Sequence, residues 1–202
     1  MPQIPGHTFC AMKCIQPLIM LRSIYILLAT LFISGTTVAQ EKLPVPPDSK
    51  NRLFFLQRDP NANTVVYDIN YTATGAIDAQ KPVKVYWIKY ATKAGATEAL
   101  LPIEEKLAYG VITELADAAA KVYKMNLVAY KKLDIFLKPA KSHTKAYHAE
   151  VTANGRTLQL QKVFLRLENP ASLKPKLLYI EFTGKDIRSG KMVTEKVIPE
   201  SI

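Results

Sequence analysis

Cysteine is scarce in this chain, and it is missing from the part that we expect to fold. Cys10 and Cys14 are the only cysteines among the 202 residues, and both precede a short apolar run at residues 24–33. Everything after that run therefore lacks disulfides, thiol nucleophiles and an acceptor for a lipid anchor. A domain of this kind depends on a hydrophobic core for its stability. The CxxxC spacing has no partner pair, so it does not predict a zinc or redox site.

Long apolar runs are also missing. The run at residues 24–33 is well short of the roughly 20 residues that a membrane-spanning helix needs. A basic residue precedes it, and small and polar residues ending in Ala39 follow it, which is the pattern of a secretory signal peptide. We therefore predict a signal peptide over residues 1–39 and an exported protein of the bacterial periplasm or outer cell surface, not membrane-spanning once processed. Met20 would itself begin a leader of ordinary length, which would make Met1–Ile19 a mis-called start.

Motifs for nucleophilic catalysis and metal binding are absent after residue 40. There is no GxSxG, and the only histidines there are His143 and His148. Two histidines without a third ligand predict no metal site, because catalytic zinc usually has three protein ligands. His148 and Glu150 would share one face of a strand, either as an acid–base pair or as a polar pair on a solvated face. We expect no catalytic residues, no metal and no cofactor, and an enzyme is the less favoured interpretation.

Acidic residues are outnumbered by basic ones. The chain has 27 lysines and arginines and 17 aspartates and glutamates, and Lys13 and Arg22 are the only charges before residue 40. The remainder therefore has 25 cations and 17 anions, a net charge of +8. This excess favours anionic partners, but it also fits lysines spread along strand edges for solubility. No run of five like charges occurs, and this lack of clustering favours the second interpretation, in which the lysines serve solubility. Export argues against a nucleic-acid partner.

The sequence after residue 51 alternates as β-strands do. Residues 40–51 contain three prolines and predict an extended linker, and residues 52–202 predict a single domain. Asn154-Gly155 is a strong signal for a two-residue hairpin turn. Residues 82–91 are apolar and aromatic on both faces, as in a central strand. We expect about nine strands, at residues 53–58, 64–71, 82–91, 121–130, 133–138, 145–153, 156–167, 176–183 and 192–198.

One short helix is predicted between the third and fourth of these strands. Pro102 suits its first position, Ile103 and Leu107 form an apolar i,i+4 stripe, and Gly110 provides a stop. Residues 113–120 are rich in helix formers but have a thin apolar stripe, so they fit a second helical turn or a loop. The fold class is therefore all-β, an antiparallel meander that forms a barrel or a sandwich, with one or two short helices.

Aromatic and charged residues provide the candidate ligand contacts. Aromatic rings with interleaved lysines can line a groove for a sugar or a lipid, although strand cores also need such residues. Arg58 precedes a turn, where it would pair with Asp68 or Glu105, or else meet an anionic ligand. The adjacent Glu104 and Glu105 fit the positive start of the helix better than paired catalysis. The candidate ligand-binding residues are Arg58, Tyr67, Tyr86, Trp87, Glu105 and Tyr109.

Three segments together resemble a known family. They are Leu53–Arg58 continuing through Asn63–Asp68, then Pro82–Ile88, then Ile103–Gly110. Their order and spacing are similar to those of the family called domain of unknown function 4833, found in exported bacterial proteins. The resemblance covers roughly residues 50–200. It implies a single bacterial domain of unassigned activity and supplies no catalytic residues.

Three functions remain open from the sequence. The favoured one is a non-catalytic binding module for an amphipathic or anionic envelope ligand, such as a lipid, a glycan or another small anion. The second is a hydrolase of envelope carbohydrates or esters, with Glu105, Asp68 or His148 as acid–base groups. The third is a structural or assembly partner in the cell envelope. The oligomeric state does not follow from the sequence.

Overall fold

The computed structural model describes residues 43–140, 146–172 and 175–199, which form an all-β unit. The predicted signal peptide, residues 1–39, lies outside the described residues. No helix within the described ranges is long and apolar enough to cross a membrane. The elements are β1 Arg52–Arg58, β2 Asn61–Ile69, β3 Val83–Lys89, α2 Tyr90–Lys93, β4 Ala96–Ala99, α3 Pro102–Glu104, the π-helical turn η1 Glu105–Tyr109, β5 Val111–Asp117, β6 Val122–Leu127, β7 Tyr130–Pro139, β8 Tyr147–Ala153, β9 Arg156–Glu168, β10 Lys176–Asp186 and β11 Met192–Val197.

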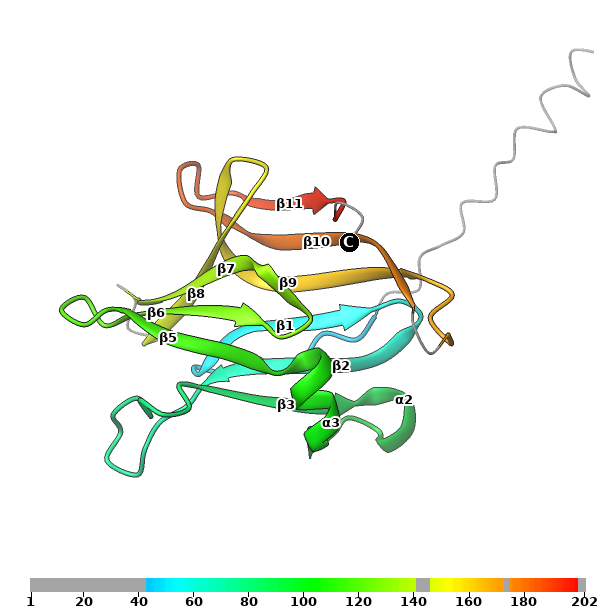
Figure 1. Ribbon diagram of the computed structural model, residues 1–202, viewed down its shortest axis with the longest axis horizontal. Helices are drawn as coiled ribbons and strands as arrows, with labels where there is room; N and C mark the ends of the chain where they lie inside the picture. The colour runs from blue at the N-terminus through cyan, green and yellow to red at the C-terminus, as the bar shows by residue number, and fades with distance from the viewer. Residues whose placement is uncertain (1–42, 141–145, 173–174, 200–202) are drawn as a thin grey trace, which may run out of the picture. The chain divides into compact units, whose positions relative to one another are not determined.

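The strands form one curled sheet, a half-barrel (Figure 1). Its order is β4-β3-β2-β1-β9-β8-β7-β6-β5, and β10 and β11 extend it beyond β9. The predicted all-β class is confirmed, with one difference in strand pairing. β1 and β9 run parallel, with Phe55 opposite Lys162, whereas the other strand pairs are antiparallel. A parallel pair needs a long crossover connection, and local alternation of residues does not reveal such long-range pairing.

The strand β9 organises the sheet because it is long enough to pair with three neighbours. Its first residues pair with β8, its later residues pair with β1, and β10 runs along most of its length. Register shifts in the β9–β10 pair mark the bends that curl the sheet. Gly184 lies at one of them, where an added Cβ would come within 2.3 Å of the Gln159 carbonyl oxygen. Only glycine allows this close approach of the two backbones.

A single hydrophobic core fills the concave side. Tyr67, Phe54, Phe182 and Met125 are among its largest fully buried side chains. The rings of Phe54 and Tyr67 stack with centroids 4.5 Å apart. Each fully buried side chain of this size contributes roughly 1.5–3 kcal/mol through loss of apolar surface from water. The core thus stabilises the described unit without disulfides.

The segment between β4 and β5 departs most from the expected secondary structure. The expected helix is present as α3 and η1, which lie over β2 and β3 (Figure 1). The expectation of a helical turn or loop is wrong for residues 113–117, because β5 covers Val111–Asp117 and pairs with β6, whereas residues 118–120 do form a turn. Cross-strand pairing outweighs the helix propensity of this segment. α2 and β4 were not expected from the sequence.

Candidate functional site

An apolar pocket of about 160 Å³ lies at the end of the half-barrel where β1 and β9 finish. Alternate residues of a strand point to the same face, so Leu56 and Arg58 of β1 both line the pocket, and so do Leu165 and Leu167 of β9. The end of η1 and the β6–β7 turn close its other sides. The described residues that line it are Leu56, Arg58, Ala108, Tyr109, Leu127, Ala129, Tyr130, Leu133, Val163, Leu165, Leu167, Pro175, Leu177, Ile180 and Phe182.

Arg58 is the one charged residue among the described residues of this lining. Its guanidinium carbon lies 5.8 Å from the centre of the Tyr109 ring, within the range of a cation–π contact. Among the described residues it has no carboxylate partner, whereas Arg166 pairs with Asp59. A half-buried arginine beside an apolar pocket is a strong donor for an anionic group.

The predicted ion pair of Arg58 with Asp68 or Glu105 is wrong. Asp68 instead accepts a hydrogen bond from Arg52, with 2.7 Å between Nε and Oδ1, and Glu105 pairs with Lys81 at 2.9 Å. Arg52 and Asp68 are opposite each other in the β1–β2 pair, so their side chains meet. A hairpin centred on its Asp59–Pro60 turn would place Arg52 opposite Tyr67, so the register shifts of the β1–β2 pair, which the sequence does not reveal, bring Arg52 opposite Asp68.

Tyr109 joins the pocket to the core. Its ring packs edge-on against Trp87, with centroids 4.9 Å apart, and its backbone carbonyl accepts a 2.9 Å hydrogen bond from the Tyr67 hydroxyl. Glu104 accepts the Trp87 indole N–H at 3.0 Å and the Leu101 amide at 2.9 Å, which fixes α3 against β3. The position of the Tyr109 ring is therefore set by contacts with two strands.

Burial keeps the tyrosines of this site neutral. Desolvation raises the pKa of Tyr109; nearby Arg58 lowers it less than burial raises it, and Glu104 adds a smaller upward effect. Complete burial raises the pKa of Tyr67 far above its ordinary value, and Tyr109 adds to the increase. At neutral pH both hydroxyls are protonated, so the charge contributed by the described lining residues comes from Arg58.

The six residues predicted from the sequence are not all at one place. Arg58 and Tyr109 line the pocket, Trp87 packs against Tyr109, and Tyr67 supports Tyr109 from the core. Glu105 is on the exposed side of η1, and Tyr86 lies in a separate groove. Sequence reasoning missed the aliphatic walls on β7, β9 and β10, because leucines in strands have the same pattern whether they line a pocket or fill a core.

Tyr86 belongs to a polar groove of about 560 Å³ over β2, β3 and β4. Its hydroxyl donates a 2.9 Å hydrogen bond to Asp68, and Arg52 donates to the same carboxylate. Burial raises the pKa of Tyr86, the hydrogen bond to Asp68 raises it further, and Arg52 opposes both. The hydrogen-bonding groups of these three side chains are paired with one another, so the role of the cluster is to hold β1, β2 and β3 together.

The candidate acid–base residues do not converge in either cavity. His148 and Glu150 share a hydrogen bond of 2.9 Å between Nε2 and Oε1, and Lys138 lies 2.6 Å from the other carboxylate oxygen. Burial alone would raise the pKa of Glu150, but hydrogen bonds from Lys138 and His148 lower it overall. Neither His148 nor Glu150 lines the pocket or the groove. No group of three or more metal-ligating side chains is found within the described residues.

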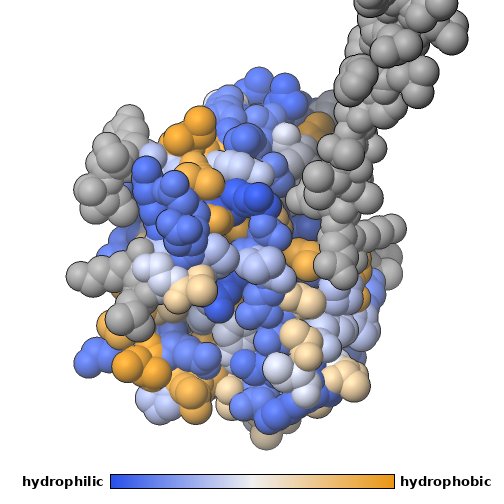
Figure 2. Space-filling view, turned by 90° about the vertical axis from the view of Figure 1, so that its right-hand side faces the viewer, coloured by the Kyte–Doolittle hydropathy of each residue, from blue (hydrophilic) through white to orange (hydrophobic). Residues whose placement is uncertain are grey.

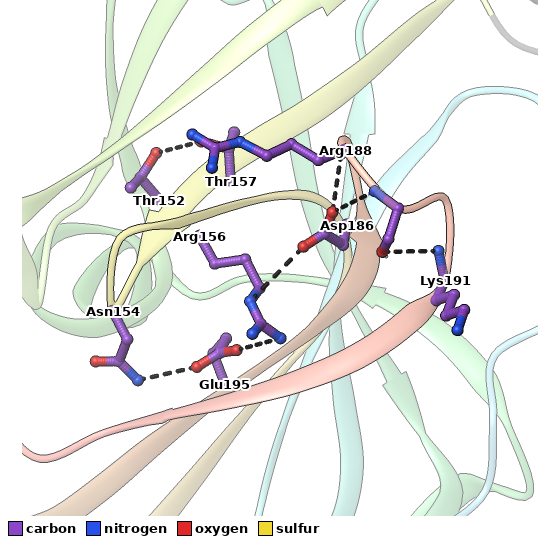
Figure 3. Close-up of polar contacts among 9 residues, drawn as sticks. Thr152, Asn154, Arg156, Thr157, Asp186, Arg188, Lys191 and Glu195 are labelled. Atoms are coloured by element: carbon purple, nitrogen blue, oxygen red, sulfur yellow. Dashed lines mark hydrogen bonds and ion pairs between the residues drawn. The ribbon is translucent and has the colours of Figure 1, made fainter.

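A cluster of charged side chains lies at the start of β9, at the opposite end of this strand from the pocket (Figure 3). Arg156 lies 3.1 Å from Glu195 and 3.6 Å from Asp186. Backbone N–H groups of Ser189 and Arg188 donate to Asp186; they lower its pKa against the opposing effect of burial. Arg156, the first residue of β9, thus holds the β10–β11 hairpin through two carboxylates, which is a structural role.

These features define the class: an all-β half-barrel with a small apolar pocket at one end and an arginine beside it. The family described as domain of unknown function (DUF4833) matches residues 54–196, and the chain belongs to this family. No curated protein and no solved structure matches the chain. The predicted family is confirmed, and every pocket residue lies within the matched segment.

Proposed function

We propose that this domain is a non-catalytic binding module for a small amphipathic anion, exported to the bacterial periplasm or cell surface. The observation that carries the proposal is the apolar pocket, in which Arg58 is the one charged side chain of the described lining. The hydrocarbon part of the ligand enters the pocket, and its acidic head meets the Arg58 guanidinium. The apolar run at residues 24–33 and the small residues after it support the location.

The pocket size selects the ligand. Its volume of about 160 Å³ is below the roughly 300–1,000 Å³ of pockets for drug-sized molecules. It therefore suits a short alkyl chain or a single ring, and a longer chain would leave part of its length outside. Each buried methylene contributes about 0.8 kcal/mol, so four of them contribute roughly 3 kcal/mol before association costs. We expect weak binding of a free ligand, in the high micromolar to millimolar range.

The recognition of the head is electrostatic. A guanidinium offers two parallel N–H groups to a carboxylate, sulfate or phosphate, and such charge-assisted bonds are about twice as strong as neutral ones. The Tyr109 ring supports the guanidinium from one side. An uncharged ligand of equal length would gain the apolar contacts but not this bond.

The test compares hexanoate with hexanol on the purified protein. Trp87, the only tryptophan, packs against Tyr109, so its fluorescence reports occupancy, and calorimetry supplies an independent affinity. We expect hexanoate to bind about tenfold more tightly than hexanol, in line with the value of a charge-assisted hydrogen bond. Arg58→Gln should remove that preference, and Arg58→Lys should keep part of it. Ala108→Phe should weaken both ligands by filling the pocket.

Arg156→Gln is the matched control, because Arg156 lies at the opposite end of β9. It should leave the affinities of both ligands unchanged. If folded wild-type protein binds neither a carboxylate nor a sulfate or phosphate ester of a short alkyl chain, the proposal is wrong. Equal affinities for hexanoate in wild type, Arg58→Gln and Ala108→Phe would also overturn it.

A further inference from the structure

Three large apolar side chains are exposed on the segment that covers the pocket. Leu101, Ile103 and Leu107 have exposed fractions of 57%, 64% and 64%, and together we call them the apolar ridge. Figure 2 shows the side of the domain at the right of Figure 1, where one group of hydrophobic side chains lies at the lower left and another nearer the top, among hydrophilic side chains. Isolated exposed leucines are ordinary, but three within seven residues form a patch.

Unpaired cations accompany this ridge. Lys106 directly precedes Leu107, and Lys131 and Lys132 are the second and third residues of β7. The β6–β7 turn just before them is held to the end of η1 by a 2.9 Å hydrogen bond from the Val128 amide to the Gly110 carbonyl. Within the described residues these three exposed lysines have no ion pair. The carboxylates in the same segment are engaged, Glu105 by Lys81 and Glu104 by Trp87. The surface is therefore apolar and positively charged together.

We propose that the apolar ridge and these lysines dock the domain on an anionic lipid bilayer. The ridge enters the interface between head groups and acyl chains, and the lysines contact the head groups. The charge complementarity argues for a lipid surface, because a neutral apolar partner would leave three cations without counterions. Docking itself goes beyond the proposed function. One consequence rests on that function: the pocket between η1 and the β6–β7 turn would take its amphipathic ligand from this bilayer.

The two attractions are individually weak. Three partly inserted side chains or three lysines alone give marginal binding, and stable association with a membrane generally requires two signals. Loss of one lysine near a charged bilayer weakens partitioning by about fivefold. Removal of two lysines should therefore weaken it by about 25-fold.

The test is co-sedimentation with vesicles of phosphatidylglycerol and phosphatidylcholine. The chain from Gln40 onward is suitable, because every residue of the core cluster lies within it. We expect binding that rises with the phosphatidylglycerol fraction and falls at high salt. Lys131→Gln with Lys132→Gln should weaken partitioning by about 25-fold, and Ile103→Ser with Leu107→Ser should weaken it by at least tenfold.

The matched controls lie at the β10–β11 turn, far from the ridge. Ile187→Ser and Lys191→Gln remove an exposed apolar side chain and a lysine there, and they should not change partitioning. Equal partitioning of the ridge variants, the lysine variants and these controls would overturn the docking surface. So would equal binding to vesicles of phosphatidylcholine alone, or loss of a dimer in the ridge variants, since a second protein would then cover the ridge.

The docking surface and the ligand pocket can be rejected independently of each other. Arg58→Gln should partition to vesicles as the wild type does, since Arg58 is not part of the ridge. The ridge variants should bind free hexanoate with unchanged affinity. Vesicle binding without hexanoate binding would leave the docking surface in place and reject the pocket as a ligand site.

Discussion

Replacing Tyr67 with phenylalanine removes one hydroxyl that connects the core to the pocket. The Tyr67 side chain is fully buried, and its hydroxyl donates a 2.9 Å hydrogen bond to the Tyr109 carbonyl. The phenyl ring of the variant retains the stacking on Phe54, so no large cavity forms. What changes is the backbone carbonyl at the end of η1, which loses this donor.

The magnitude follows from an unsatisfied acceptor. Leaving a buried polar group without its partner costs about 1–3 kcal/mol. We expect Tyr67→Phe to lower the free energy of unfolding by about 2 kcal/mol. For a domain of this size that corresponds to a decrease in Tm of roughly 4–8 °C. Hexanoate should also bind more weakly, because Tyr109 is less firmly placed beside Arg58.

Urea unfolding followed by Trp87 fluorescence measures the effect. The control is Tyr179→Phe, a half-buried tyrosine whose ring contacts Lys196 and would be retained. We expect this control to change stability by less than about 0.5 kcal/mol. If Tyr67→Phe is as stable as the Tyr179→Phe control, the bond to Tyr109 does not stabilise η1 and the reasoning is refuted.

Alkaline pH gives the same prediction a second readout. Burial raises the pKa of Tyr67 in the folded state above its ordinary value of 10.0. Above pH 10 the unfolded chain releases this proton while the folded state keeps it, so stability decreases as pH rises. The slope from this one group is about 1.4 kcal/mol per pH unit. Tyr67→Phe should show a shallower decrease than the wild type above pH 10.

Two further changes test other parts of the structure. Gly110→Ala would place a Cβ 2.0 Å from the Glu105 carbonyl oxygen, so η1 must shift. We expect the variant to have a lower Tm and to bind hexanoate more weakly. An unchanged Tm and affinity would contradict this close approach of Gly110 to Glu105. Glu150→Gln tests stability at acidic pH. Hydrogen bonds from Lys138 and His148 outweigh the effect of burial and lower the pKa of Glu150. The contribution of Glu150 to the free energy of unfolding is therefore present above its ordinary pKa of 4.5 and is lost as pH falls through the lowered pKa. The variant should lose less stability than wild type between pH 5 and pH 3 in urea titrations, and parallel curves would count against this assignment.

The sequence predicts the strands better than it predicts their partners. Alternation and the Asn154-Gly155 turn place most strand centres correctly, because these signals are local. The parallel contact of β1 with β9 joins residues about a hundred positions apart, and no local pattern encodes it. β5 was missed because its residues are exposed and rich in helix formers, so only pairing with β6 makes it a strand.

The same limit explains how far the candidate site was predictable. Arg58, Trp87 and Tyr109 were singled out for their chemistry, and the fold brings them together through η1. Tyr86 was chosen for the same chemistry but points to the other face of β3, because it is adjacent to Trp87 and neighbours in a strand alternate. A strict use of that alternation would have separated the two residues from the sequence alone.

The family match encloses the described lining of the pocket and all of the groove lining except Asn51. The match begins at residue 54 and ends at residue 196, and the described lining of the pocket runs from Leu56 to Phe182. The groove takes Asn51 from the segment before the match, and Arg52, which orients Asp68, also precedes it. A family member that lacks residues 43–53 would keep every pocket wall and lose the arginine of the groove cluster. Hexanoate binding by such a member would therefore assign the ligand site to the pocket.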